Sequence, residues 1–400
     1  MKKKKDIEHI VLADDTYQYA GVPIILKKTE AWVDNGEYHT LIIGGTGGGK
    51  TECIIKPLTK ILAKAGESMI ITDPKAEIYE ETAGLLKAKG YKIIVINFRD
   101  TLKGNCWNPL TLPYKFFKEG RQDKTNELLS DLAINILIDP NNKAEPFWEQ
   151  TASDYFKGLA LGLFEDAKED EINFNSLNLM STYGELRYHG IPYSKLYFDQ
   201  KGYGSEIYNS VTATIDGPAD TKNSILSTFK SKMSIFTTNN VLSEMLSKSD
   251  FDFDKIGMEK TAIFLCIHDE KKTYHSLMTT FIKQAYESLI AQAQACGGKL
   301  PVRTNFLLDE FANMPALKDV DTMISAARSR NIRFDFVIQN FSQLNQVYGA
   351  DMAETIKGNC GNVHFLSTAE LKALEEFSKL CGDKKPKKNK ENRGFFFNLV

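Results

Sequence analysis

Residues 44–51 read Gly44-Gly45-Thr46-Gly47-Gly48-Gly49-Lys50-Thr51, which is a glycine, four residues of any kind, and then Gly-Lys-Thr. An apolar run of strand type, residues 39–43, precedes this stretch, and apolar residues at helical spacing follow it from 52 to 62. A strand that turns sharply into a helix leaves backbone N–H groups unpaired at the positive end of the helix dipole, where they bind phosphate. We therefore predict a P-loop over residues 44–51.

Each residue type in this loop suits the binding of ATP and Mg²⁺. The glycines can adopt positive φ and let the backbone approach the phosphate oxygens. Lys50 supplies a mobile cation for the β- and γ-phosphates, and the Thr51 hydroxyl can ligate Mg²⁺. The alternative is a glycine-rich turn that ends in Gly-Lys-Thr by chance, and the strand and helix on either side disfavour it.

Length and composition set broad limits on the class of protein. A chain of 400 residues exceeds one typical core, so we expect two domains or one domain enlarged by an insertion. The 42% hydrophobic and 26% charged residues are ordinary for a globular protein. The net charge of −2 argues against a uniformly basic nucleic-acid coat, although a charged channel or patch stays possible.

The compartment follows from the cysteines and from apolar run lengths. The six cysteines lack CxxC or other metal spacing, and we interpret them as buried thiols in a reducing compartment. No apolar run approaches the roughly 20 residues that span a bilayer. We therefore expect a cytoplasmic chain without a transmembrane segment.

Strands alternate with helices on both sides of a long helical region. Strand-type runs at 68–72 and 91–96 flank a helix at 76–89, and further strands are predicted at 261–267, 304–308, 334–338 and 362–366. This alternation predicts an α/β fold with a central, mostly parallel sheet flanked by helices. We expect the strand at 39–43 to be central in that sheet.

The strand signal disappears between about residues 113 and 250. Helical patterns at 126–138, 147–166 and 224–236 replace it, while residues 183–216 show no clear pattern. We predict an all-α domain at 113–250 inserted into a nucleotide-binding domain formed by 38–112 and 251–382. Residues 1–37 form a leader with edge strands or a hairpin, and the basic tail at 383–400 is expected to be disordered.

The run Asn305-Phe306-Leu307-Leu308-Asp309-Glu310 has the form of the second half of an NTPase site. We expect this apolar strand to place Asp309 at its carboxyl end, next to the P-loop in a parallel sheet, where it can hold the Mg²⁺ shell. Glu310 can then take a proton from the attacking water. Two adjacent acids on a strand point to opposite sides, so their roles differ. The alternative is a pair of acids that merely ends a buried strand.

Other polar residues near strand ends are weaker candidates. Gln339 ends the next strand and could sense the γ-phosphate or orient water, or could simply satisfy a loop. Arg328 and Arg330 precede that strand and could reach the nucleotide of a neighbouring subunit, although spacing alone favours surface arginines. The acids of the Asp73-Pro74-Lys75-Ala76-Glu77 stretch also face the nucleotide edge of the sheet, yet Asp-Pro alone is a turn signal.

An ordered set of motifs resembles the type IV secretion coupling proteins of the TraG and TraD kind, relatives of FtsK-like DNA translocases. The resemblance covers roughly residues 35–382 and rests on several motifs in order. They are His39 to Thr51 with its P-loop, residues 73–77, Trp107-Asn108-Pro109-Leu110, Pro146-Phe147-Trp148-Glu149, Leu308-Asp309-Glu310-Phe311, and the stretch from Ala327-Arg328 through Gln339-Asn340-Phe341-Ser342-Gln343-Leu344.

This resemblance implies a RecA-like P-loop ATPase that assembles as a homo-hexameric ring at the inner face of the cell membrane. Such rings use ATP to bring relaxase-bound single-stranded DNA, or protein substrates, to secretion channel subunits. The resemblance also strengthens the assignment of Arg328, Arg330 and Gln339 to the site. Family members usually carry transmembrane helices, a longer C-terminus and a glycine where Ala76 stands, so this chain is expected to need a membrane partner.

Two other functions stay open. A shortened chain of this kind could bind nucleotide and dock relaxosome or secretion partners without translocating DNA. A P-loop kinase acting on a small molecule is a weaker alternative, because an acid placed to activate water, as Glu310 is, suits hydrolysis better than transfer.

Overall fold

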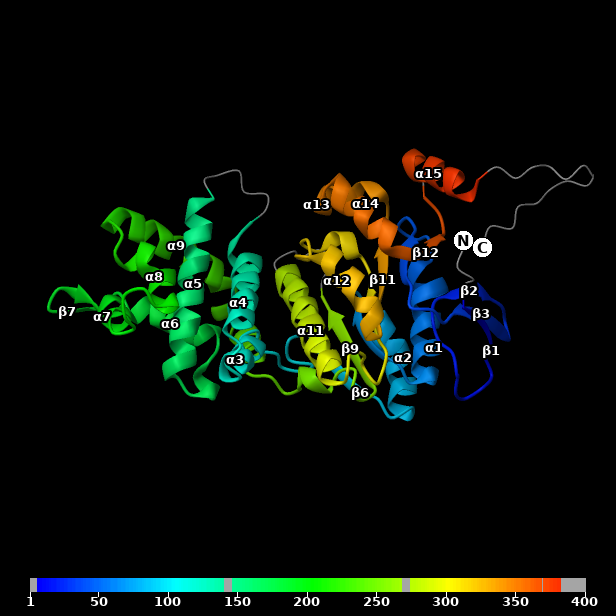
Figure 1. The fold of residues 1–400 in the computed structure, drawn as a ribbon, viewed down its shortest axis with the longest axis horizontal. Coiled ribbons are helices and arrows are strands. Elements are labelled where there is room, and N and C mark those ends of the chain that lie inside the picture. The colour runs from blue at the N-terminus through cyan, green and yellow to red at the C-terminus, as the bar shows by residue number, and fades with distance from the viewer. Residues whose placement is uncertain (1–5, 140–145, 268–273, 369, 383–400) are drawn as a thin grey trace, which may run out of the picture. The chain divides into compact units, whose positions relative to one another are not determined.

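The computed structural model describes residues 6–139, 146–267, 274–368 and 370–382 (Figure 1). The lysines at 2–5 and the basic tail at 383–400 lie outside these residues. The chain divides into two compact units, one comprising Met1–Ile93, Ile256–Phe264 and Gln292–Val400, and the other Ile94–Lys255 and Leu265–Ala291. The domain boundaries derived from the sequence stay a prediction.

A seven-stranded sheet dominates the described α/β part. Its order is β12-β4-β11-β10-β5-β9-β6, and the pairings of β12 with β4, β4 with β11, β11 with β10 and β10 with β5 are parallel. The bounds are β4 (His39–Ile43), β5 (Ser68–Thr72), β6 (Lys92–Asn97), β9 (Thr261–Cys266), β10 (Thr304–Leu308), β11 (Ile332–Ile338) and β12 (Cys360–Phe365). Every residue of β4, β5, β9, β10 and β11 is buried, as expected for parallel strands covered on both faces.

The helices of the first unit pack on this sheet. They are α1 (Lys56–Ala65), α2 (Glu77–Ala88), α12 (Val320–Ala327), α13 (Phe341–Tyr348), α14 (Ala350–Asn359) and α15 (Leu371–Cys381). Helix α1 contacts β5, α12 and α13 contact β11, and α14 contacts β12. The predicted α/β class, a mostly parallel sheet flanked by helices, is confirmed.

The expectation that the P-loop strand is central is wrong, and the strand order holds a second unpredicted feature. Strand β4 is second from one edge, between β12 and β11, and is therefore not central. Strand β11 lies between β4 and β10, so the strand that leads to Asp309 is not the neighbour of the P-loop strand. Periodicity identifies strands but carries no information about crossovers, which decide the order of strands in a parallel sheet.

The leader forms a separate antiparallel sheet of order β1-β3-β2, from β1 (Ile7–Val11), β2 (Pro23–Leu26) and β3 (Glu30–Asp34). The hairpin alternative is confirmed by β2 and β3, whereas edge strands of the main sheet are not observed among the described leader residues. Arg333 on β11 fastens the leader, because its Nη1 donates to Ala20 O over 3.0 Å while its Nη2 pairs with Glu67 at 2.6 Å.

The second unit is mainly helical, as predicted for its central stretch. Its helices are α3 (Thr111–Lys118), α4 (Gln122–Leu137), α5 (Phe147–Asp166), α6 (Phe174–Tyr183), α7 (Tyr193–Asp199), α8 (Glu206–Ile215), α9 (Ala219–Thr237) and α10 (Asn240–Met245), and α11 (His275–Ala295) begins there. Helix α5 contacts α4, α6, α8 and α9 (Figure 1). The unassigned stretch at 183–216 holds α7, α8 and a short hairpin of β7 (Arg187–Tyr188) and β8 (Ile191–Pro192).

The cysteines differ in their exposure to solvent. Cys266 and Cys360 are buried, but Cys53, Cys296 and Cys381 are exposed, so the prediction of buried thiols is wrong for these three.

None of the helices in the described ranges is long and apolar enough to cross a membrane.

Candidate nucleotide-binding site

The P-loop connects the carboxyl end of β4 to the first turn of the following helix. Its backbone is fixed from both sides, since Gly44 N donates to Ile338 O at the end of β11 and Gly45 N donates to Ser367 O after β12. Gly47 and Gly49 have φ values of 74° and 80°, which residues with a Cβ rarely adopt. The glycines therefore permit the tight path that points backbone N–H groups into the loop.

The helix after the loop begins with an unusual turn. Residues Thr51–Ile55 form a π-helical turn, in which Lys56 N donates to Thr51 O, before α1 continues as an ordinary α-helix. Pro57 follows directly and has no N–H to donate to Cys53 O, which weakens the α-helical alternative at this point. The turn begins at Thr51, directly after Lys50, and these are the two residues predicted to contact metal and phosphate.

Lys50 is held inside the loop. Its side chain is 7% exposed, and its Nζ donates to Gly44 O over 2.8 Å and lies 3.7 Å from Glu310 Oε1. The P-loop cation and the predicted base are therefore close neighbours. A phosphate placed in the loop would offer Nζ stronger acceptors than the Gly44 carbonyl, because charge-assisted hydrogen bonds are roughly twice as strong as neutral ones.

Thr51 and Asp309 bring two hard oxygen ligands together. Thr51 Oγ1 donates to Asp309 Oδ2 over 3.3 Å, although β11 separates their strands. Burial and the neighbouring Glu310 raise the pKa of Asp309 to about 6, against the opposing effect of the Glu310 N–H. A hydroxyl and a carboxylate at this separation fit Mg²⁺, which prefers oxygen ligands, and Mg²⁺ bound there would neutralise charge on the phosphates.

Glu310 does not lie on the strand, because β10 ends at Leu308. Its φ of 53° is left-handed, and this conformation, rather than strand alternation, separates its side chain from that of Asp309. Glu310 Oε2 accepts hydrogen bonds from Gln339 Nε2 over 2.9 Å and from Asn313 Nδ2 over 3.0 Å. The carboxylate predicted to act as base is thus positioned by two amide side chains.

Gln339 links the base to the P-loop. While its Nε2 donates to Glu310, its Oε1 accepts from Thr46 Oγ1 over 3.4 Å and from Gln343 Nε2 over 3.4 Å. A single amide therefore contacts residues from the loop, from the end of β10 and from α13. The side chains of Thr46, Lys50, Glu310 and Gln339 form one connected group.

The opposite end of β11 carries the two arginines. Arg328 and Arg330 lie in a 3₁₀ turn before Ile332, so the length of β11, roughly 20 Å for seven residues, separates them from Gln339. Arg330 Nη1 is occupied by Ala326 O at 2.9 Å, whereas Arg328 Nε is buried without a hydrogen-bond partner among the described residues. Within one subunit, neither arginine is placed beside the P-loop.

Several contacts at the site were not predicted. Ser367 anchors the loop backbone, Asn313 positions the base, and Thr72 Oγ1 donates to Asp309 O over 2.8 Å. Ser367 and Thr72 stand at or directly after predicted strand ends, so the edge rule could have found them. No sequence pattern pointed to Asn313, because its contact with Glu310 depends on the turn between them.

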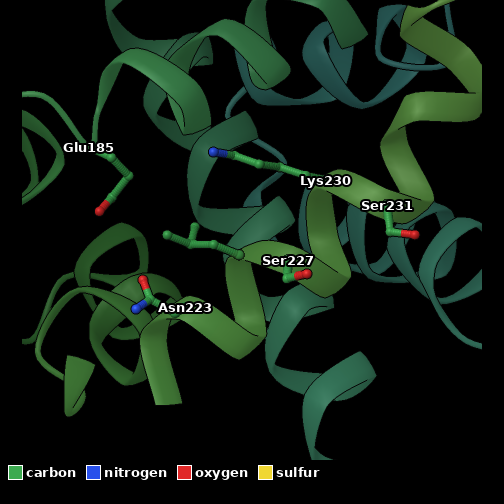
Figure 2. A pocket seen from close by; sticks show the side chains of 6 residues that line it. Glu185, Asn223, Ser227, Lys230 and Ser231 are labelled. Atoms are coloured by element: carbon green, nitrogen blue, oxygen red, sulfur yellow. The ribbon is translucent and has the colours of Figure 1, made fainter. Parts of the chain in front are cut away.

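Two hollows in the helical unit contain none of these residues. One of about 690 Å³ is lined by Glu185 and by one face of α9, and Figure 2 shows Glu185 and Lys230 extending towards it. The other, of about 520 Å³, lies among α5, α6 and α7. Glu185 already pairs with Lys222 at 3.0 Å. Neither hollow therefore includes a residue of the predicted nucleotide site.

Comparison with solved structures supports this description of the fold. The chain resembles the plasmid coupling protein TrwB in complex with ADP and Mg²⁺, with a TM-score of 0.61 at 14% identity, over 90% of this chain and 79% of that one. VirB4 of Thermoanaerobacter pseudethanolicus gives a TM-score of 0.53, also at 14% identity, over 93% of this chain and 90% of that one. The fold is thus that of a RecA-like P-loop protein.

Comparison with known protein sequences identifies the family of the chain. Protein VirD4 of Rhizobium radiobacter is 27% identical over 88% of this chain and 49% of its own length. Conjugal transfer protein TraG of Agrobacterium fabrum (strain C58 / ATCC 33970) is 22% identical over 90% of this chain and 53% of its own length. The chain therefore spans about half the length of these relatives. Residues 2–397 match the family described as type IV secretory system conjugative DNA transfer, and the chain belongs to this family of coupling proteins.

Proposed function

We propose that the chain is an Mg²⁺-dependent ATPase that drives substrates of a conjugation system towards the secretion channel. The observation that carries this proposal is the connected group of Thr46, Lys50, Glu310 and Gln339, next to the oxygen pair of Thr51 and Asp309. Phosphate-binding, metal-binding and water-activating groups stand together at one sheet edge. This is the set that ATP hydrolysis requires.

Each group has a separate task in the proposed reaction. Backbone N–H groups of residues 44–51 and Lys50 bind the phosphates, and Thr51 and Asp309 would hold Mg²⁺. The Glu310 carboxylate accepts the proton of the attacking water, while Gln339 orients that carboxylate and stays within reach of Thr46 in the loop. Occupation of the loop can thereby change the position of the base.

Arg328 is the residue proposed to act on a neighbouring subunit. Its Nε has no hydrogen-bond partner among the described residues, while Arg330 is already bonded to its own turn. Because Arg328 lies at the edge of the sheet opposite the P-loop, it can stabilise transition-state charge only at another copy's nucleotide. A homo-hexameric ring provides such a neighbour for every subunit.

The proposed substrates follow from the family. TraG is named a conjugal transfer protein and TrwB a plasmid coupling protein, and this chain belongs to the conjugative DNA transfer family and shares the fold of TrwB. We propose relaxase-bound single-stranded DNA or relaxosome proteins as substrates, delivered to channel subunits at the inner face of the membrane. Hydrolysis would move loops that line the centre of the ring.

Steady-state ATPase activity tests the proposal. Turnover per subunit should rise with protein concentration and with single-stranded DNA, and Lys50→Ala and Glu310→Gln should each lower it at least about 100-fold. Lys60→Ala, on the exposed surface of α1, serves as the control and should retain turnover. Nucleotide binding with background turnover under every condition would contradict the motor and favour a docking protein. A phosphorylated small-molecule product would instead indicate a kinase.

A further inference from the structure

The ring of Tyr38 holds the guanidinium of Arg328. Arg328 Cζ lies over this ring, 5.7 Å from its centroid, which is within the range of a cation–π contact. The Arg328 side chain forms no hydrogen bond or ion pair with a described residue, and its Nε is buried. An aromatic face attracts the cation without accepting its in-plane N–H groups, whereas a carboxylate would accept them. The donors of Arg328 therefore stay available to an anion.

Two glycines make room for the Tyr38 ring. A Cβ on Gly361 would lie 2.5 Å from Tyr38 Cδ1, and a Cβ on Gly36 would lie 2.7 Å from Cδ2 and Cε2. Gly361 stands where the register of β12 with β4 shifts, and such irregularities commonly redirect neighbouring side chains. A glycine in a strand often marks the close approach of another group. The ring thus occupies a position that depends on glycine at both places.

The next residue, His39, fixes the helix that leads to the arginine. His39 Nδ1 accepts from Phe334 N over 3.0 Å, and its Nε2 donates to Ile324 O over 2.7 Å. Burial lowers the pKa of His39 to about 4, so the neutral ring makes both bonds in one tautomer near pH 7. Ile324 lies in the last turn of α12, directly before Arg328. Tyr38 and His39 together connect the start of β4 with the arginine turn.

We propose that Tyr38 is a positioning residue for Arg328, holding the guanidinium where it can reach the nucleotide of a neighbouring copy of this chain. This inference rests on the proposed action of Arg328 between subunits. A ring that already limits the rotamers of a long side chain lowers the entropy lost when that side chain docks. Tyr38 also stands directly before β4, which leads to the P-loop of its own subunit. The inference therefore requires that loss of the ring act on the neighbour's P-loop and leave its own intact.

Four substitutions separate the ring from its surroundings. Tyr38→Leu removes the aromatic face, while Tyr38→Phe keeps the face and removes only the hydroxyl. Gly361→Ala keeps the tyrosine but displaces its ring, because the added Cβ would lie 2.5 Å from Cδ1. Gly358→Ala is the matched control, since a Cβ at that position meets nothing within 4 Å.

The experiment measures steady-state ATPase activity of single variants and of equal mixtures with Lys50→Ala. Tyr38→Leu and Gly361→Ala should each lower turnover about tenfold, whereas Tyr38→Phe and Gly358→Ala should stay within about twofold of the wild type. Tyr38→Leu mixed with Lys50→Ala should exceed the mean of the two components several-fold, because the second subunit offers an intact Tyr38 and Arg328 to the P-loop of the first. In an Arg328→Ala background, Tyr38→Leu should cause no further loss.

The possible results distinguish the inference from the function on which it rests. Wild-type turnover in Tyr38→Leu, beside a large loss in Arg328→Ala, would overturn the inference alone. A Tyr38→Leu defect that mixing does not restore would do the same, because the damage would then lie in the P-loop strand of the same subunit. Wild-type turnover in Arg328→Ala would contradict the proposed role of that arginine and this inference with it. If circular dichroism shows that Tyr38→Leu is unfolded, Gly361→Ala takes its place in the mixtures, since it leaves both side chains of the contact unchanged.

Discussion

Gln339 Nε2 donates to Glu310 Oε2 over 2.9 Å, and the same amide accepts from Thr46 Oγ1 over 3.4 Å. The end of β11 thus connects the P-loop with the predicted base, although the two belong to strands that are not neighbours. This arrangement requires an amide, because Gln339 must donate on one side and accept on the other. A carboxylate in its place would repel Glu310.

Removal of this amide should affect turnover more than binding. We expect Gln339→Ala to lower the ATPase rate about 10- to 100-fold, because the base loses the group that orients it, while the nucleotide dissociation constant changes little. Gln346→Ala removes an exposed amide from α13, the helix that follows Gln339, and should leave the rate unchanged. Equal rates for Gln339→Ala and the wild type would show that the hydrogen bond only packs the loop.

The arginines can be separated by mixing subunits. Arg328→Ala should lower turnover about 10³-fold, while Arg330→Ala, whose side chain bonds its own turn, should retain most of it. Arg328→Ala mixed with Lys50→Ala should recover turnover, because a subunit of the second kind offers its arginine to an intact P-loop of the first. A mixture as inactive as its two components would exclude action between subunits.

Ala76 offers a test of backbone strain. Its φ is 61°, so its Cβ meets the steric cost of the left-handed region at the start of α2. Glycine removes this cost but also increases the conformational entropy of the unfolded chain. As the net result, Ala76→Gly should raise the free energy of unfolding by about 0.5–1 kcal/mol in urea titrations. The same change at Ala83, in the interior of α2, should lower it by a similar amount. Destabilisation by Ala76→Gly would contradict the strain.

Asp335 predicts a pH dependence of stability. Its burial raises its pKa to about 6, against the attraction of Arg333 and a hydrogen bond from Thr40. The folded state therefore keeps this proton to a higher pH than the unfolded state. The contribution is fully present below the unfolded pKa near 4 and is lost as pH rises through 6.

Asp335→Asn removes this titration. Relative to the wild type, the variant should gain roughly 1–3 kcal/mol in free energy of unfolding between pH 4 and pH 7. Asp14→Asn, at an exposed position, should follow the wild-type curve. Parallel curves for Asp335→Asn and the wild type would mean that the neighbouring arginine cancels the effect of burial.

Much of the fold was predictable because its signals are local. The stretch Gly44 to Thr51 requires left-handed glycines and a following helix, and both occur. Continuous apolar runs identified strands such as β5 and β10 with unchanged bounds, since parallel strands are buried on both faces. The residues that end these strands were therefore assignable to one edge of the sheet.

The structure decided whatever depends on contacts between distant segments. The order of strands, with β11 between β4 and β10, is a consequence of crossovers that no periodicity records. The same holds for the left-handed Glu310 and for the leader sheet that Arg333 holds through Ala20 O. Residue type and strand position are local properties, so the amino-acid sequence alone was enough to predict which groups form a nucleotide site. Only the tertiary structure decided which of them touch, because hydrogen bonds between Gln339, Glu310 and Thr46 require three segments to meet.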